Sequence, residues 1–289
     1  MKALFLIVLA IAILGSGAYV TYEMIIRPKQ ELKAEQALPP PPPPPDPTVP
    51  EFEKAIAARQ TGKLLDAREA LAGFVERYPE SSKIDEAKNI LGDINTLIFL
   101  SPRPAPEKQT YVVKSGDVIT RVARKLLLPP ELLMRSNNLK SDKLQIGQKL
   151  TYVTPDFSVI ISRRSDRVTL LNKGRFFKHY PIHSWPAAHA KIPLTAGRKA
   201  APLPKQSGKV KDKIAWVDGQ RAIFTEPGFW TAKFWIEITI HGCTLYPLPD
   251  KDAPETPNSK PINGGIALTP AALTELGALL SDGDPVILE

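Results

Sequence analysis

The chain has 289 residues, of which 43% are hydrophobic and 24% are charged, a composition typical of globular proteins. Its formal net charge of +8 favours acidic partners, but no basic helix or aromatic-spaced motif indicates nucleic acid, which is therefore not an expected partner. One cysteine, Cys243, excludes an intramolecular disulfide and a cysteine zinc cluster. No metal or cofactor motif is present, so neither a metal nor a cofactor is expected.

Residues 1–26 are predicted to form a transmembrane signal anchor. Residues 3–22 are 20 uncharged residues, about the length of a helix that spans a bilayer, and Lys2 precedes them on the side expected to stay inside. A cleaved signal peptide is the alternative, with "GSGA" at 15–18 as its cleavage site. Both interpretations place the rest of the chain outside the cytoplasm.

Two segments follow before the first recognisable domain. Residues 27–50 are a linker whose seven consecutive prolines, 39–45, predict an extended, stiff spacer. Residues 51–98 carry apolar residues at three- and four-residue steps and predict a short helical hairpin module, with Pro79 ending one helix. The module resembles a single tetratricopeptide unit and is interpreted either as a spacer or as a site for a protein partner. Residues 99–109 are a second linker.

Residues 110–154 predict the order strand, helix, helix, strand. Residues 111–113 are a short β run, and Asp117 is placed to cap the first helix. Pro130 suits the first turn of the second helix, which Asn137 and Asn138 end, and "GQKLTYV" follows as a strand after the turn at Gly147.

The stretches "YVVKSGDVITRVARK", "NNL" and "LQIGQKL" of this segment resemble a LysM domain. The resemblance implies binding of N-acetylglucosamine-containing glycan, chiefly peptidoglycan, in a groove between the loop after the first strand and the loop before the last. Backbone amides beside aliphatic side chains suit acetamido groups. The alternative is a LysM fold that only spaces domains. The residues implicated are Gly116, Asp117, Val118 and Ile119 on one side, and Leu144, Gln145, Ile146 and Gly147 on the other.

Residues 156–289 predict a mainly-β domain. Strands are expected at "FSVIISRR", on both sides of the turn "NKGR", at "FWIEITIHG" and at "PVILE". A helix is expected at "TPAALTELGALL", capped by Thr269 with Pro270 in its first turn. The basic stretch "KQSGKVKDK" at 205–213 is interpreted as a solvated loop.

The order of these elements, with "IPLTAG", "IHG" and the closing helix and strand, resembles an L,D-transpeptidase domain of the YkuD type. Such enzymes cross-link peptidoglycan stem peptides through a cysteine thiolate. The family signature "SHGCIRL" corresponds here to "INGGIAL", so Asn263 replaces the histidine, Gly264 is kept, Gly265 replaces the nucleophile and Ala267 replaces the arginine. Glycine offers no nucleophile, so the resemblance implies a domain that has lost catalysis.

A relocated active site is the alternative to lost catalysis. His241 matches the upstream family histidine, and Cys243 lies two residues later, on the same face if the backbone is an extended strand. An active L,D-transpeptidase or a related peptidoglycan-remodelling enzyme would then use Cys243 with His241. The competing interpretation is a buried, structural Cys243.

Together these features predict a multidomain chain with an N-terminal transmembrane helix, a small helical hairpin module, a βααβ LysM domain and a mainly-β L,D-transpeptidase-like domain. The expected function is peptidoglycan binding, with recognition of the stem peptide as an addition. The expected location is a bacterial inner membrane, with a single pass and the C-terminal bulk in the periplasm or cell-wall space.

Overall fold

The computed structural model describes residues 15–17, 19–27, 29, 46–186, 204–217, 220–224, 226, 228–229, 232–248 and 265–289. The chain divides into two compact units, residues 1–46 and residues 47–289. In the first, a short π-helix η1 (Tyr22–Ile26) is described, and none of the described helices is both long and apolar enough to span a bilayer. Most of the predicted anchor, residues 1–14, and the seven prolines lie outside the described residues.

The second unit begins with three helices, as the apolar spacing predicts: α3 (Val49–Gln60), α4 (Leu64–Arg77) and α5 (Ile84–Phe99). Helix α4 ends two residues before Pro79, whose ring is incompatible with a continuing helix. Neighbouring helices pack together through fully buried residues such as Leu71, Phe74 and Leu91. The helical character of 51–98 is therefore confirmed, while the likeness to a tetratricopeptide unit stays a prediction.

The LysM segment has the predicted βααβ order: β1 (Gln109–Val112), α6 (Ile119–Lys125), α7 (Pro130–Ser136) and β2 (Lys149–Tyr152). The two strands pair antiparallel. Pro130 begins α7 as expected, because a proline in the first turn loses no helical hydrogen bond. The expectation that Asp117 caps α6 is wrong, since Val118 is the N-cap residue and no side chain caps this helix.

The C-terminal part is one sheet of nine strands and one helix. Eight strands follow the order β10-β9-β8-β6-β11-β3-β4-β5, and β7 pairs with β6. Only β10–β9 and β11–β3 are parallel among the described pairs. The elements are β3 (Phe157–Ser162), β4 (Arg167–Asn172), β5 (Arg175–Pro181), β6 (Gln206–Val217), β7 (Gln220–Ala222), β8 (Lys233–Ile238), β9 (Thr244–Pro247), β10 (Gly265–Leu268), α8 (Pro270–Leu279) and β11 (Pro285–Leu288).

Several predicted elements of this part are confirmed, one is wrong, and one strand, β8, forms where expected but ends early. Strands β3, β4, β5 and β11 form where expected, and Thr269 caps α8 by accepting a hydrogen bond from the Ala272 N–H at 3.2 Å. The basic stretch 205–213 is not a loop, because residues 206–217 form β6 in the middle of the sheet. The strand expected at "FWIEITIHG" ends at Ile238, before the histidine.

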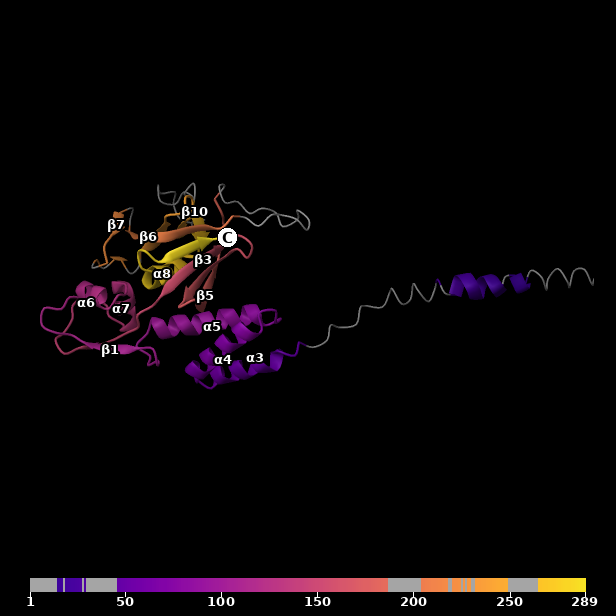
Figure 1. Cartoon of the computed structure of the whole chain (residues 1–289), viewed down its shortest axis with the longest axis horizontal. Helices are drawn as coiled ribbons and strands as arrows, with labels where there is room; N and C mark the ends of the chain where they lie inside the picture. Colours follow the sequence, from indigo (N-terminus) through magenta and orange to yellow (C-terminus); the bar gives the residue numbers. More distant parts are fainter. Residues whose placement is uncertain are drawn as a thin grey trace, which may run out of the picture. The chain divides into compact units, whose positions relative to one another are not determined.

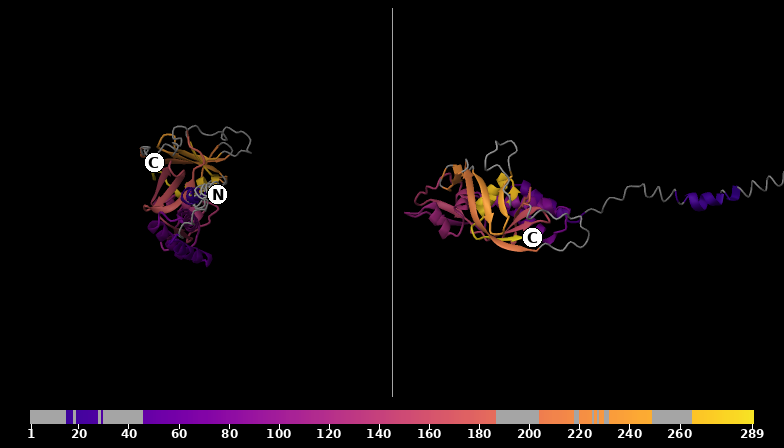
Figure 2. Two further views of the ribbon diagram at one scale, coloured as in Figure 1. Left: turned by 90° about the vertical axis from the view of Figure 1, so that its right-hand side faces the viewer. Right: turned by 90° about the horizontal axis from the view of Figure 1, so that it is seen from above.

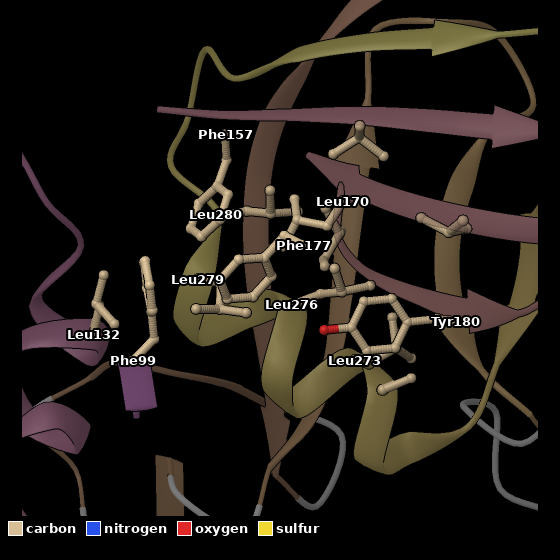
Figure 3. Packing of buried hydrophobic residues seen from close by; sticks show 14 of the residues in the cluster. Phe99, Leu132, Phe157, Leu170, Phe177, Tyr180, Leu273, Leu276, Leu279 and Leu280 are labelled. Carbon is tan, nitrogen blue, oxygen red and sulfur yellow. The ribbon is translucent and has the colours of Figure 1, made fainter. Parts of the chain in front are cut away.

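Strands from distant positions in the sheet contact the same helix, α8. Gly277 of α8 lies against Phe234 of β8, and Glu275 of α8 accepts a hydrogen bond from the Tyr180 hydroxyl of β5 at 3.3 Å. The sheet therefore curls around α8, whose apolar residues fill its concave face (Figures 1 and 3). Helix α8 also packs against β9 and α7, and its residues Leu273, Leu276 and Leu279 are fully buried.

One apolar core joins the three parts of the second unit. Phe99 at the end of α5 packs edge-on against Phe177 of β5 with the ring centroids 4.8 Å apart, and Phe157 of β3 completes the aromatic cluster. Leu132 of the LysM helix α7 lies in the same core beside α8 (Figure 3). Phe99 thus belongs to the core, although the sequence suggested that a linker begins there.

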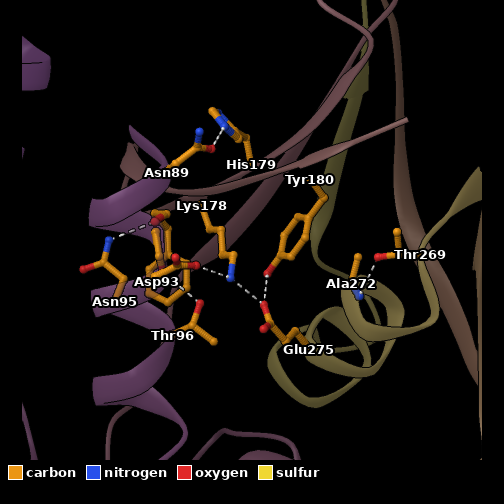
Figure 4. A network of polar contacts seen from close by, with 12 residues as sticks. Asn89, Asp93, Asn95, Thr96, Lys178, His179, Tyr180, Thr269, Ala272 and Glu275 are labelled. Atoms are coloured by element: carbon orange, nitrogen blue, oxygen red, sulfur yellow. Dashed lines mark hydrogen bonds and ion pairs between the residues drawn. The ribbon is translucent and has the colours of Figure 1, made fainter. Parts of the chain in front are cut away.

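Helix α5 lies alongside β5, the last strand of the sheet, with α4 and α3 on the far side of α5 (Figures 1 and 2). The Asn95 side chain donates a hydrogen bond to the carbonyl of Phe177 on β5 at 2.9 Å. Lys178 forms ion pairs with Asp93 of α5 at 3.1 Å and with Glu275 of α8 at 2.9 Å (Figure 4). The helical module therefore covers an edge strand that would otherwise expose unpaired backbone groups.

Candidate functional site

Two loops of the LysM segment form the first candidate site. The first loop is residues 113–118, after β1, and the second loop is residues 144–148, before β2. The Gly147 N–H donates to the Val113 carbonyl at 2.9 Å, and the Val113 N–H donates to the Gln148 carbonyl at 2.9 Å. Within the second loop, the Gln145 N–H donates to the Gln148 side chain at 3.0 Å. The two loops predicted to form the groove are thus joined side by side.

The first loop is held in shape by its own polar groups. The Asp117 carboxylate accepts hydrogen bonds from the Lys114 N–H and the Tyr111 hydroxyl, both at 2.8 Å. These hydrogen bonds lower the pKa of Asp117, and the one from the Lys114 N–H has the larger effect. The Arg121 guanidinium donates to the Gly116 carbonyl at 3.0 Å, and Gly116 has a φ of 80°, a conformation that favours glycine. Asp117 and Gly116 therefore shape the loop.

Apolar side chains project from both loops. Val118 is 48% exposed and Ile146 is 75% exposed, so each of the two joined loops presents a large aliphatic side chain to solvent. Leu144 is half-buried and packs against the core. Ile119 is only 2% exposed and packs inside the LysM core. A direct contact between Ile119 and a ligand is therefore not what the fold provides, whereas Val118 and Ile146 are available for one.

The second candidate site is the strand β10, which carries the altered family motif. Asn263 and Gly264 lie outside the described residues, while Gly265 and Ala267 are buried on β10. A Cβ atom at Gly265 would lie 2.5 Å from Cδ1 and 2.7 Å from Cε1 of Tyr246, and 3.1 Å from the Thr244 carbonyl oxygen. The ring of Tyr246, itself 5% exposed, occupies the place where a side chain at 265 would begin.

The Ala267 position is equally closed. Its N–H donates to the Ser184 carbonyl at 3.0 Å, and its carbonyl accepts from the His183 N–H at 2.9 Å. Ala267 has no solvent exposure. At this position of β10 the side chain is buried and both backbone groups are already hydrogen-bonded.

His241 and Cys243 do not lie on one strand face. Gly242 between them has a φ of 74°, and the Cys243 N–H donates to the Ile240 carbonyl at 3.2 Å, so residues 240–243 form a tight turn between β8 and β9. The turn leaves His241 exposed and Cys243 with no solvent exposure. Burial raises the pKa of the Cys243 thiol to about 11, against a weaker lowering by Arg163.

The prediction that His241 and Cys243 share one face is therefore wrong, because the alternation of side chains holds for an extended strand and residues 240–243 form a turn. A thiol with a pKa of about 11 is almost entirely protonated at neutral pH, and the thiolate is the nucleophile. The described geometry thus lacks the exposed thiolate that the relocated-nucleophile alternative requires.

Sequence reasoning missed Tyr246, the residue that fills position 265. Its role depends on the parallel pairing of β9 with β10, in which Thr244 lies opposite Gly265. No local pattern in "TLYP" indicates that pairing. Among the described residues, no three His, Cys, Asp or Glu side chains are grouped so that they could hold a metal ion.

Comparison with protein families matches residues 111–151 to the model described as the LysM domain. Among solved structures, L,D-transpeptidase 1 of Mycobacterium tuberculosis is 11% identical, with a TM-score of 0.28 over 49% of this chain and 66% of that one, so the chain spans less than two thirds of its length. The catalytic domain of an Enterococcus faecium L,D-transpeptidase acylated by ertapenem is 15% identical, with a TM-score of 0.28 over 46% of this chain and 97% of that one.

A third similar structure is a fused Zn-dependent amidase/peptidase/peptidoglycan-binding domain-containing protein from Clostridium acetobutylicum. It is 14% identical, with a TM-score of 0.30 over 77% of this chain and 83% of that one. TM-scores of this size carry no argument about the fold of residues 156–289, whose likeness to L,D-transpeptidases rests on the sequence motifs. What the family comparison establishes for this chain is a match to the LysM domain at residues 111–151.

Proposed function

We propose that this chain is a cell-envelope protein that binds peptidoglycan through its LysM domain and carries an L,D-transpeptidase-like domain that has lost catalysis. The observation that carries the proposal is the LysM match at 111–151 together with the two loops joined at Gly147 and Val113. Val118 and Ile146 offer exposed aliphatic surface beside loop backbone. An acetamido group needs this combination, an apolar contact for its methyl group and hydrogen bonds for its amide.

Loss of catalysis is supported by the packing of β10. Gly265 has no side chain, and the Tyr246 ring fills the space in which a nucleophile at 265 would start. Cys243 is fully buried and has a raised pKa. We infer that the C-terminal domain contributes binding and scaffolding, with the stem peptide as its candidate ligand.

We further propose that residues 1–26 anchor the chain in a bacterial inner membrane and that the bulk lies in the periplasm or cell-wall space. The run of 20 uncharged residues after Lys2 supports this location. A protein partner of the helical module would be confined to α3 and α4 and the outer side of α5, because β5 already covers the inner face of α5.

Sedimentation with insoluble peptidoglycan tests the binding proposal. The full-length chain should sediment with peptidoglycan, and Val118→Ser combined with Ile146→Ser should weaken binding about tenfold or more, because two exposed apolar contacts are lost. Leu65→Ser combined with Ile223→Ser is the matched control, since these aliphatic residues are 36% and 58% exposed outside the LysM domain. Binding that survives the loop variant unchanged would overturn the proposed site.

Intact-mass analysis after incubation with ertapenem tests the loss of catalysis. The full-length chain should show no covalent adduct. An adduct that disappears in Cys243→Ala would instead mean that the chain is an enzyme that uses Cys243. An adduct that persists in that variant would point to a different nucleophile, and either outcome contradicts the proposal.

A further inference from the structure

The LysM domain carries most of the excess positive charge of the chain. Residues 110–154 contain eight Lys and Arg residues against three Asp and Glu residues. Two of the three carboxylates already interact with other groups of the fold. The Asp117 carboxylate accepts two hydrogen bonds within the first loop, and Glu131 is 13% exposed and lies 3.6 Å from Lys213 of β6. The remaining acid, Asp142, is exposed.

Three lysines are concentrated at the two joined loops. Lys114 lies in the first loop, Lys143 precedes the second loop and Lys149 follows it. Lys149 lies opposite Val112 in the β1–β2 pair, and Val113 is bonded to Gln148, so Lys114 and Lys149 flank the same backbone junction. Lys114 thus shares the first loop with Val118, and Lys143 and Lys149 lie on either side of the second loop, which carries Ile146.

All three side chains are exposed, and within residues 109–154, which the structure describes completely, none of them is joined to a carboxylate in an ion pair. Two exposed lysines elsewhere in the second unit are paired: Lys205 binds Glu289 at 2.7 Å, and Lys211 binds Glu237 at 3.0 Å. The charges of Lys143 and Lys149 are thus left for solvent or for a ligand, whereas Lys114 lies close enough to Asp117 for its charge to add to the hydrogen bonds that lower the pKa of that carboxylate.

We propose that the LysM loop site recognises an anionic glycan, peptidoglycan whose stem peptides carry carboxylates, rather than the neutral sugar chain alone. Lys114, Lys143 and Lys149 contact the carboxylates while Val118 and Ile146 contact the acetamido groups. This inference rests on the proposed peptidoglycan binding and names the chemistry of its ligand.

The proposal gives binding a defined salt dependence. Each exposed ion pair contributes modestly and is screened by salt, so three of them together raise affinity by about five- to tenfold at low ionic strength. The gain fades as the screening length falls from about 10 Å at 0.1 M salt to about 3 Å at 1 M. Contacts to a neutral oligosaccharide carry no such dependence.

The test measures binding of the full-length chain from about 50 to 500 mM NaCl. Two probes are used: purified insoluble peptidoglycan and a soluble, neutral N-acetylglucosamine hexamer. The variant is Lys114→Gln with Lys143→Gln and Lys149→Gln. The matched control is Lys54→Gln with Lys63→Gln and Lys233→Gln, which makes the same change in net charge at exposed lysines outside the LysM domain.

The loop variant should lose about five- to tenfold in affinity for peptidoglycan at low salt and lose its salt dependence, while its affinity for the hexamer stays unchanged. The control variant should match the parent on both probes. Converting the peptidoglycan carboxylates to amides should reproduce the loss with the parent chain. Hydrofluoric acid removes phosphodiester-linked polymers from peptidoglycan. If binding persists after this treatment, the anions belong to the stem peptide. If binding falls, they belong to the attached polymer, and that part of the proposal is overturned.

The failures are distinguishable. If the parent chain binds neither probe, the proposed function fails. If it binds both and the loop variant is unaffected, the anionic ligand fails while glycan binding stands. An equal loss in the control variant would assign the effect to net charge instead of to the loops, and a loss of hexamer binding in the loop variant would show that the lysines act on the glycan or on the fold.

Discussion

Gly265→Ala tests whether the Tyr246 ring occupies the place of a side chain on β10. The new Cβ atom would lie 2.5 and 2.7 Å from two ring carbons, well inside the ordinary contact distance of about 3.5–4.0 Å, and 3.1 Å from a backbone carbonyl of β9. Tyr246 is 5% exposed, so its ring has little free space into which to move. Overpacking by one methyl group typically costs about 1–3 kcal/mol, against a gain of about 0.5–1 kcal/mol from replacing a glycine in a strand.

The net expectation is a loss of about 1–2 kcal/mol in the free energy of unfolding, or about 2–8 °C in Tm for a unit of this size. The assay is thermal unfolding followed by circular dichroism for Gly265→Ala, Tyr246→Val and the double variant. Tyr246→Val is itself destabilising, because it leaves a cavity. In that background, however, Gly265→Ala should cost clearly less than in the parent, since the two ring carbons are gone and only the 3.1 Å contact with the Thr244 carbonyl oxygen remains. An equal cost in both backgrounds, or no cost in the parent, would refute the steric argument. The same crowding predicts that Gly265→Cys alone gives no ertapenem adduct.

Three further outcomes are expected. Gly92→Ala should lower Tm, because the added methyl would lie 2.8 Å from Cγ and 3.3 Å from Cα of Lys178. Gly73→Ala on α4 should instead raise the free energy of unfolding by about 0.5–1 kcal/mol and so raise Tm. Equal shifts in Tm for the two variants would contradict the packing of α5 on β5. Burial holds the pKa of His179 at about 4, below its ordinary 6.5, so only the unfolded chain takes up this proton as the pH falls from about 6.5 to 4. The free energy of unfolding should therefore decline over this range by more in the parent than in His179→Gln. Urea unfolding at each pH measures the difference. The Cys243 thiol should react with a disulfide reagent at pH 8 at least about 100-fold more slowly in the folded than in the urea-unfolded chain, and rapid labelling of the folded chain would contradict its burial and raised pKa.

Local patterns in the sequence were sufficient for the elements that depend on local physics. The spacing of apolar residues predicts α4 and α5, a proline in the first turn predicts the start of α7, and Thr269 predicts the cap of α8. Motif similarity also located the LysM domain, and the loops that it implicated are those that expose Val118 and Ile146. Helix periodicity, capping and short turns involve residues only a few positions apart, so a single sequence contains the information.

Long-range packing decided what the sequence could not. The basic stretch 205–213 is polar enough for a loop, yet it forms β6 because β8 and β11 pair with it on both sides. His241 and Cys243 would share one face of an extended strand, but Gly242 between them has a left-handed conformation and the chain turns there.

The same holds for the residue that closes the altered motif. From the sequence alone, Gly265 shows that a nucleophile is missing at that position. Only the pairing of β9 with β10 brings the Tyr246 ring into the space beside Gly265 that a side chain would occupy. The sequence states which residue stands at a position, but the side chain that packs beside it comes from another strand and depends on how the whole sheet pairs.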